Sequence, residues 1–283
     1  MKTLGVLNRR QFMLQTGAVT AGCALGGMRW ALAQGYPTFK TPQELLLAMI
    51  AREKDSALHH DKWQYMNNER SDRTTGRLWT ERVIETEVGR VRLLIAEDGK
   101  PLSPDRAQAE RIKLNDILAH PDDFARRELA QKNEDEHSRA MLDALTRGFI
   151  LENVRLENGI WTVDFRPNPS YSPSGIEERV LHGMSGWVSV SAPDLRLAHV
   201  EARLPQDVGI GFGLLATVKA GSHFMSDRKI IDGHWHTTHL ITDIRGKAIL
   251  FKSVGRNSDW VREDFTLMPP TITPAQAVAI LQH

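Results

Sequence analysis

Leu156-Glu157-Asn158-Gly159-Ile160-Trp161-Thr162-Val163-Asp164-Phe165 predicts more about the architecture of this 283-residue chain than any other segment. Asn-Gly is a preferred pair for a two-residue β-hairpin turn. After the turn, Trp161, Val163 and Phe165 alternate with Thr162 and Asp164, which is the period of a strand with one buried face. The segment therefore predicts an antiparallel hairpin whose second strand directs large apolar side chains toward a core.

The same period continues on both sides of this hairpin. Turn residues at Asp194, Asp232-Gly233 and Arg245-Gly246 separate further runs of apolar residues. Strands are predicted over residues 149–156, 160–166, 179–191, 195–205, 217–230, 234–245 and 248–264. Nearer the N-terminus, alternation from Trp63 to Ile95 predicts a three-strand antiparallel meander. Several of these strands carry large apolar residues on both faces, so each face of the sheet needs a cover.

Three helical segments are predicted. Thr41, Pro42 and Glu44 form a helix start with a capping box, and an apolar stripe follows. Residues 103–147 are helical and highly charged, and residues 269–283 form a short C-terminal helix or tail. The predicted fold class is α+β: a long, curved antiparallel β-sheet, half-barrel-like, with helices packed on one face. We expect a single domain over residues 34–268, with the helical segment at about 103–147 as an insertion.

Residues 1–33 match a twin-arginine signal peptide. Arg9 and Arg10 are followed by Gln11 and Phe12, a weakly apolar segment leads on, and Ala31 and Ala33 form a small-x-small cleavage site. The apolar segment is too short and too rich in glycine to span a bilayer. We therefore predict export to the periplasm with the twin-arginine translocase as partner. Lipidation at Cys23 is an alternative, although Thr20 stands where a lipobox has an aliphatic residue.

Cleavage after Ala33 removes basic residues and no acidic ones, which leaves the mature chain mildly acidic. That balance argues against a nucleic-acid partner, which requires a basic surface. Cleavage also removes Cys23, which is the sole cysteine, so neither a disulfide nor a thiolate is expected in the mature chain. No later segment has the length and hydropathy of a membrane span.

Catalytic and cofactor motifs are sparse. His234 and His236 would share one face of a strand and His239 the other, which gives two candidate metal ligands without a third. The run Gly209 to Leu215 lacks the Lys-Ser/Thr of a phosphate loop. Gly183-Met184-Ser185-Gly186 is one residue short of a nucleophile elbow. No cofactor is predicted.

Several motifs carry a resemblance. They are Glu97-Asp98-Gly99-Lys100-Pro101-Leu102-Ser103, Arg166-Pro167-Asn168-Pro169-Ser170-Tyr171-Ser172-Pro173, Glu178 to Gly186, Asp194 to Ala198, and Gly211 to Leu215. With these the chain resembles a family of uncharacterised secreted bacterial proteins over most of residues 41–260. The sheet region is similar in kind to the outer-membrane lipoprotein-sorting proteins of the LolA/LolB type. That resemblance implies a curved antiparallel half-barrel that holds acyl chains against covering helices.

The leading functional hypothesis is non-catalytic binding of a lipid, a lipoprotein acyl chain or another apolar ligand in the concave face of the sheet. The ligand-cavity candidates are Trp161, Val163, Phe165, Met184, Val188 and Val190. The gate-loop candidates are Ile210, Phe212, Leu214 and Leu215. One alternative is a periplasmic hydrolase or metal-dependent enzyme that uses the histidines of residues 234–239. Another is an envelope interaction protein without a ligand.

Overall fold

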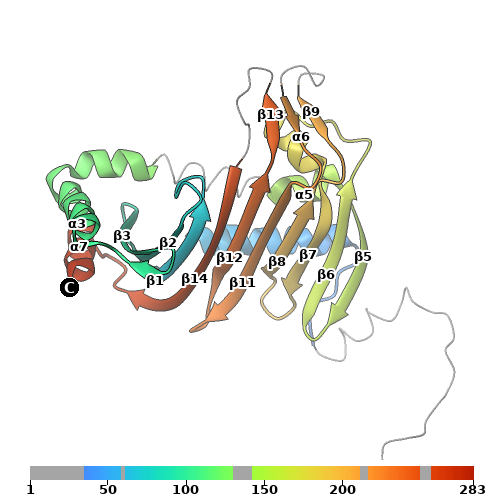
Figure 1. Cartoon of the computed structure of the whole chain (residues 1–283). Coiled ribbons are helices and arrows are strands. Elements are labelled where there is room, and N and C mark those ends of the chain that lie inside the picture. The colour runs from blue at the N-terminus through green and yellow to red at the C-terminus, as the bar shows by residue number, and fades with distance from the viewer. Residues whose placement is uncertain (1–34, 59–60, 130–141, 211–215, 249–255) are drawn as a thin grey trace, which may run out of the picture.

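The computed structural model describes residues 35–58, 61–129, 142–210, 216–248 and 256–283 (Figure 1). The helices are α2 (Pro42–Leu58), α3 (Pro104–Ala119), α5 (Leu142–Gly148), α6 (Ile176–His182) and α7 (Pro274–Gln282), and residues 121–129 are also helical. The strands are β1 (Lys62–Ser71), β2 (Leu78–Glu85), β3 (Arg90–Glu97), β4 (Lys100–Pro101), β5 (Phe149–Glu157), β6 (Ile160–Pro167), β7 (Ser185–Ser191), β8 (Arg196–Arg203), β9 (Val208–Ile210), β10 (Ala216–Val218), β11 (His223–Ile231), β12 (His234–Ile244), β13 (Gly246–Ala248) and β14 (Arg256–Met268). No helix in these ranges is long and apolar enough to cross a membrane. The predicted signal peptide lies outside them.

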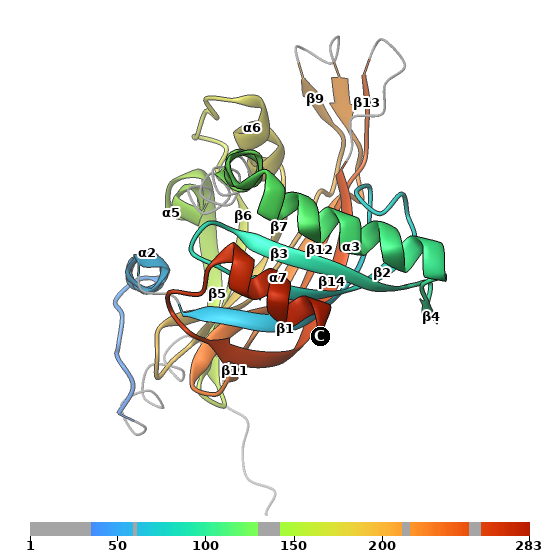
Figure 2. The same ribbon diagram turned by 90° about the vertical axis from the view of Figure 1, so that its left-hand side faces the viewer.

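One long open sheet dominates the structure. Its 11 strands follow the order β4-β3-β2-β1-β14-β12-β11-β8-β7-β6-β5, and every neighbouring pair is antiparallel. Strands β13, β10 and β9 form a separate small sheet. The long sheet twists and curves, so that β1, β2 and β3 turn out of the plane of the other strands (Figures 1 and 2). These observations confirm the predicted α+β class and the long, curved antiparallel sheet.

The two faces of the long sheet can be followed through its register, because directly paired residues point to the same side. We define the inner face as the one that carries Val188 of β7. From strand to strand, each residue of the following list is directly paired with the next, so all of them lie on the inner face: Val188, Val200, Ser226, Leu240, Trp260, Glu69 and Trp79. The opposite side is the outer face. Since side chains alternate along a strand, Val83 of β2 lies on the inner face and Ile84 on the outer face.

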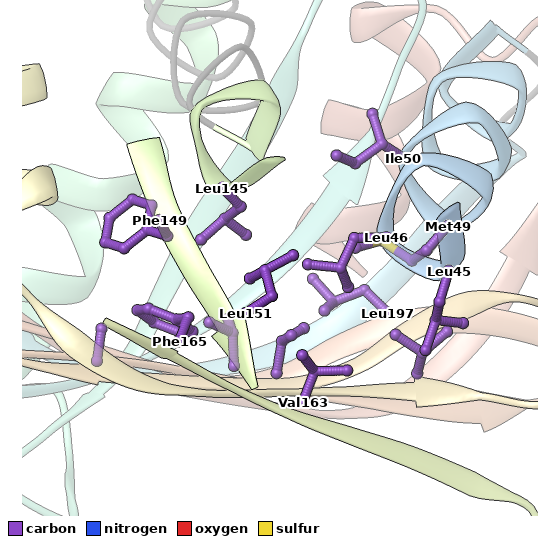
Figure 3. Close-up of a cluster of buried hydrophobic side chains, with 14 of the residues drawn as sticks. Leu45, Leu46, Met49, Ile50, Leu145, Phe149, Leu151, Val163, Phe165 and Leu197 are labelled. Atoms are coloured by element: carbon purple, nitrogen blue, oxygen red, sulfur yellow. The ribbon is translucent and has the colours of Figure 1, made fainter. Parts of the chain in front are cut away.

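Helices cover both faces, at different ends of the sheet. Helix α2 lies across the inner face, where Leu45, Leu46 and Met49 pack onto β5 to β8 (Figures 1 and 3). Helices α3 and α7 pack on the outer face at β2 and β3, around Ile84 and Val91. The expected helical cover of one face therefore applies to α2 with α5, while α3 and α7 belong to the other side. This division meets the requirement that a sheet apolar on both faces be covered on both.

Two predicted strands differ from the structure. Residues 217–230 were predicted as one strand, but β10 ends at Val218, a turn follows at residues 220–221, and β11 starts at His223.

The other strand begins later than expected. Residues 179–191 were predicted as a strand from their apolar content, but α6 occupies Ile176–His182 and β7 starts only at Ser185. Local hydrogen bonds explain the difference, because the Glu178 carboxylate accepts from both the amide and the hydroxyl of Ser174, each at 2.6 Å. They also lower the pKa of Glu178 to about 2. The negative charge of Glu178 at the first turn stabilises the helix. The alternation of apolar residues, from which the strand was predicted, does not reveal this effect.

Candidate functional site

All six ligand-cavity candidates belong to one buried cluster on the inner face. Their exposed fractions are 5% for Trp161, 3% for Phe165 and Met184, and 0% for the three valines, Val163, Val188 and Val190. Figure 3 shows Leu45, Leu46 and Met49 of α2 on one side of this cluster and Val163 on the other. The structure therefore brings the predicted residues together, in contact with a helix that fills the space above them.

A buried carboxylate fixes α2 to the sheet. Glu53, on the fourth turn of α2, accepts hydrogen bonds from Arg196 Nε at 2.8 Å and from the backbone N–H of Leu197 at 3.0 Å. Its Oε1 also lies 2.7 Å from Arg228 Nη1, and the three side chains are only 12–16% exposed. Burial by itself raises the pKa of Glu53, but the hydrogen bond from Arg196 and the charge of Arg228 outweigh it and hold the pKa below 4.5. We refer to these contacts of Glu53 as the α2 latch.

The backbone geometry of β8 explains why the latch forms at this position. Pairing between β8 and β11 runs from Arg203 only as far as His199. Beyond it the N–H and C=O of Leu197 have no strand partner on that side, and buried backbone groups need one. Glu53 accepts from the N–H, and Arg228 donates to the C=O at 3.3 Å. Side chains thus replace the missing ladder and attach the helix where the two strands separate.

The inner face becomes polar and charged beyond the part covered by α2. At β1 and β2, Glu69 and Glu81 are only 8% and 3% exposed. Arg73 binds both carboxylates, with nitrogen–oxygen distances of 2.6–3.1 Å. Asn67, 1% exposed, donates to the same two carboxylates at 3.3 Å. The two acids are therefore satisfied by neighbours on their own hairpin.

Arg262 of β14 lies beside this network without an acidic partner. Its Nε donates to Asn67 at 3.4 Å, and its guanidinium carbon lies 3.9 Å from the ring centre of Trp260 and 4.8 Å from that of Tyr65. No carboxylate of the described ranges lies within ion-pair distance of it. Burial lowers the pKa of Arg262, yet its side chain keeps some exposure to solvent. Tyr65 is 1% exposed and its hydroxyl has no hydrogen-bond partner among the described residues.

The two histidines predicted as metal ligands, His234 and His236, lie near each other, but both pack against aromatic rings. Both rings contact Trp63, with centroids 5.2 Å away for His234 and 4.5 Å for His236, and His236 also packs on Phe265. Burial, together with the positive charges of His234 and Arg228, lowers the pKa of His236 to about 4. Within the described ranges, no group of three or more His, Cys, Asp or Glu residues is placed to hold a metal ion.

The gate-loop candidates are largely outside the described ranges, where Phe212, Leu214 and Leu215 fall. Ile210 ends β9, where it pairs with Ala216 of β10. An open hollow of about 410 Å³ is found elsewhere, on the outer face over β11, β12 and β14. Most of its lining residues belong to that face, among them Asp227, His239 and Glu263, and Arg262 lines it as well. It therefore lies on the opposite side of the sheet from the predicted ligand-cavity residues.

Fold and site together define an α+β protein with an open, curved antiparallel sheet and one helix fixed across its inner face. No family model matches the chain, and no curated protein matches it. Among solved structures, it is similar to the LolA superfamily protein NE2245 from Nitrosomonas europaea, with 10% identity over 82% of this chain and 95% of that chain and a TM-score of 0.27.

The predicted site residues omitted the charged ones that shape the inner face. Glu53, Arg228 and Arg262 are each separated by many residues from the apolar candidates, and nothing local marks Glu53 or Arg228. Arg262 does carry a signal, because it stands two residues after Trp260 and shares its face of β14. A charged residue at an inward position of a strand is unusual enough to be singled out.

Proposed function

We propose that the protein is exported to the periplasm and there binds a lipid, a lipoprotein acyl chain or another apolar ligand on the inner face of its sheet. The observation that carries the proposal is the position of α2. This helix, with Leu145 of α5 beside it, covers the apolar cluster from β5 to β8, and Glu53 fixes it to the sheet. If α2 moves aside, the side chains beneath it present an apolar surface, whose burial under a ligand is worth about 25 cal/mol per Å².

The first experiment asks whether the protein carries a ligand. The full chain is produced with its own N-terminus, isolated from the periplasmic fraction and extracted for lipid mass spectrometry. We expect a lipid in a defined ratio to protein, and binding of the neutral fluorescent probe N-phenyl-1-naphthylamine after delipidation. A protein that carries no lipid and leaves the probe unbound would overturn the proposal.

A second experiment tests the part assigned to α2. The variant Glu53→Gln weakens the latch, whereas Lys54→Gln breaks only the exposed ion pair between Lys54 and Asp143 one position further along. We expect faster probe uptake in Glu53→Gln than in the natural protein, and no change in Lys54→Gln. Equal uptake rates in all three proteins would show that α2 does not control access to the site.

Export is tested separately from binding. The support for it is the pattern of residues 1–33, with Arg9 and Arg10 before an apolar segment. Replacement of both by lysine should leave the protein in the cytoplasmic fraction with the segment uncleaved. Unchanged fractionation of that double variant would contradict export by the twin-arginine route.

A further inference from the structure

The inner face holds a partly buried cation, Arg262, for which no carboxylate of the described residues lies within ion-pair distance. Arg73 is matched by Glu69 and Glu81, whereas the polar and ring contacts of Arg262 with the described residues are to the amide oxygen of Asn67 and the rings of Trp260 and Tyr65. A guanidinium that is partly withdrawn from water without a counter-charge is destabilised, because it loses part of its hydration. Cation–π contacts with Trp260 and Tyr65 recover only part of that loss. The position is therefore one where an anion would be strongly stabilised.

Other groups around Arg262 add to the positive potential. Arg90 and Arg92 of β3 lie close enough to lower the pKa of Arg262, and Arg262 in turn contributes to the low pKa of His236. The acidic group that acts on Arg262 is Glu85, which lies beyond ion-pair distance. Arg92 lies 4.0 Å from Glu81, whereas no carboxylate of the described residues lies within ion-pair distance of Arg262.

A neutral donor at the same place lacks an acceptor. The Tyr65 ring lies against the Arg262 guanidinium, and its buried hydroxyl has no partner among the described residues. Buried hydroxyl groups nearly always have one. An anionic oxygen would accept hydrogen bonds from both the phenol and the guanidinium, which are donors in their ordinary protonation states.

We propose that Arg262 and Tyr65 form a subsite for the anionic head of an amphiphile, a carboxylate or a phosphate, whose tail lies on the apolar inner face beneath α2. The inference rests on the proposed function and specifies its ligand class. From β14 the apolar cluster is reached across β12, β11 and β8 to β7. Four strand spacings amount to about 19 Å, a length that an extended long-chain acyl group covers.

The test compares ligands that share a tail and differ only in charge. Palmitate, hexadecyl phosphate and the neutral methyl ester of palmitate, whose chains are long enough for this span, are each tested for displacement of N-phenyl-1-naphthylamine from the delipidated full chain. We expect at least one of the two anions to bind about tenfold more tightly than the ester, since a charge-assisted hydrogen bond contributes about 1.5–3 kcal/mol. The two anionic arms separate a carboxylate head from a phosphate head.

Three variants assign the preference to the subsite. Arg262→Gln should abolish it while the affinity for the methyl ester stays the same, which also reports that the site remains folded. Tyr65→Phe removes only the unpartnered hydroxyl, so it should fold normally and lose several-fold in affinity for the preferred anion. Arg256→Gln, at the exposed start of the same strand, should keep the preference.

Two results would overturn the inference, and they differ from each other. Equal binding of the anions and the ester by the natural protein, or a preference retained in both Arg262→Gln and Tyr65→Phe, would refute the anionic subsite and leave apolar binding intact. Failure of the probe and all three ligands to bind would refute the proposed function, and the subsite with it.

Discussion

Replacement of Glu53 by glutamine should destabilise the protein far more than its single-atom change in shape implies. The carboxylate is 15% exposed and forms ion pairs with Arg196 and Arg228, which are 16% and 12% exposed. Without it, two buried guanidinium groups remain without their carboxylate. Removing one partner of a buried ion pair costs about 3–5 kcal/mol, and since glutamine retains an acceptor oxygen for Leu197, we expect the lower end of that range. This is a large share of the roughly 5–15 kcal/mol by which domains are stable.

Urea unfolding followed by tryptophan fluorescence measures this loss, with hydrogen exchange of residues 42–58 as a local readout. Lys54→Gln is the matched control: its ion pair with Asp143 is 62% and 38% exposed, and such pairs contribute about 0–1 kcal/mol. Because the pKa of Glu53 lies below 4.5 in the folded protein, its contribution is complete above that pH and is lost as the pH falls further. The Glu53→Gln variant should lack this acid-dependent component. Equal stability of the two variants, or unchanged exchange of α2 in Glu53→Gln, would refute the reasoning.

Three further outcomes are expected. Gly186→Ala should destabilise the sheet by about 1–3 kcal/mol or more, because its new methyl carbon would lie 1.8 Å from the carbonyl oxygen of Glu201. Gly175→Ala meets no atom within 4 Å and should cost less in thermal unfolding, about 1 kcal/mol at most, because glycine is preferred to alanine at the N-cap of α6. Thr273→Ala removes the capping box of α7 and should cost about 1 kcal/mol in urea unfolding; no loss would mean that the tertiary contacts of α7 fix its start. The pKa of His236 is lowered to about 4 from 6.5 in the folded protein, so stability should fall as the pH drops from 6.5 to 4, when the unfolded chain takes up the proton first. His236→Phe should flatten that part of a stability–pH curve, and an unaltered curve would contradict the assignment.

Much of the inner face could be predicted, because burial of one face of a strand produces an alternation of apolar and polar residues that is visible in the sequence. Trp161, Val163 and Phe165 alternate with polar residues, and all three are buried on one side of β6. Asn158 and Gly159 adopt positive φ angles at the predicted hairpin turn. These features depend on residues a few positions apart, so a single sequence contains them.

The function of these residues was harder to predict, because the alternation of side chains shows which face of a strand is buried but does not show what covers that face. The alternation of Val188 and Val190 is the same whether a ligand or a helix lies above them. In the structure that position is taken by Leu46 and Met49 of α2, which precede β7 by more than a hundred residues. Whether the helix gives way to a ligand is what the latch and uptake experiments measure.

The sequence by itself determined most of the strands and turns, the α+β class and the buried side of strands such as β6, because these follow from the alternation of side chains and from turn chemistry over short distances. Only the tertiary structure decided which side carries α2 and which carries α3 and α7, since both faces of the sheet are apolar. The tertiary structure also decided which residues the charged side chains contact. Glu53 meets Arg196 and Arg228, and Arg262 meets Tyr65, through pairings far apart in the chain. Contacts of that kind arise from strand order and register, which no local pattern encodes.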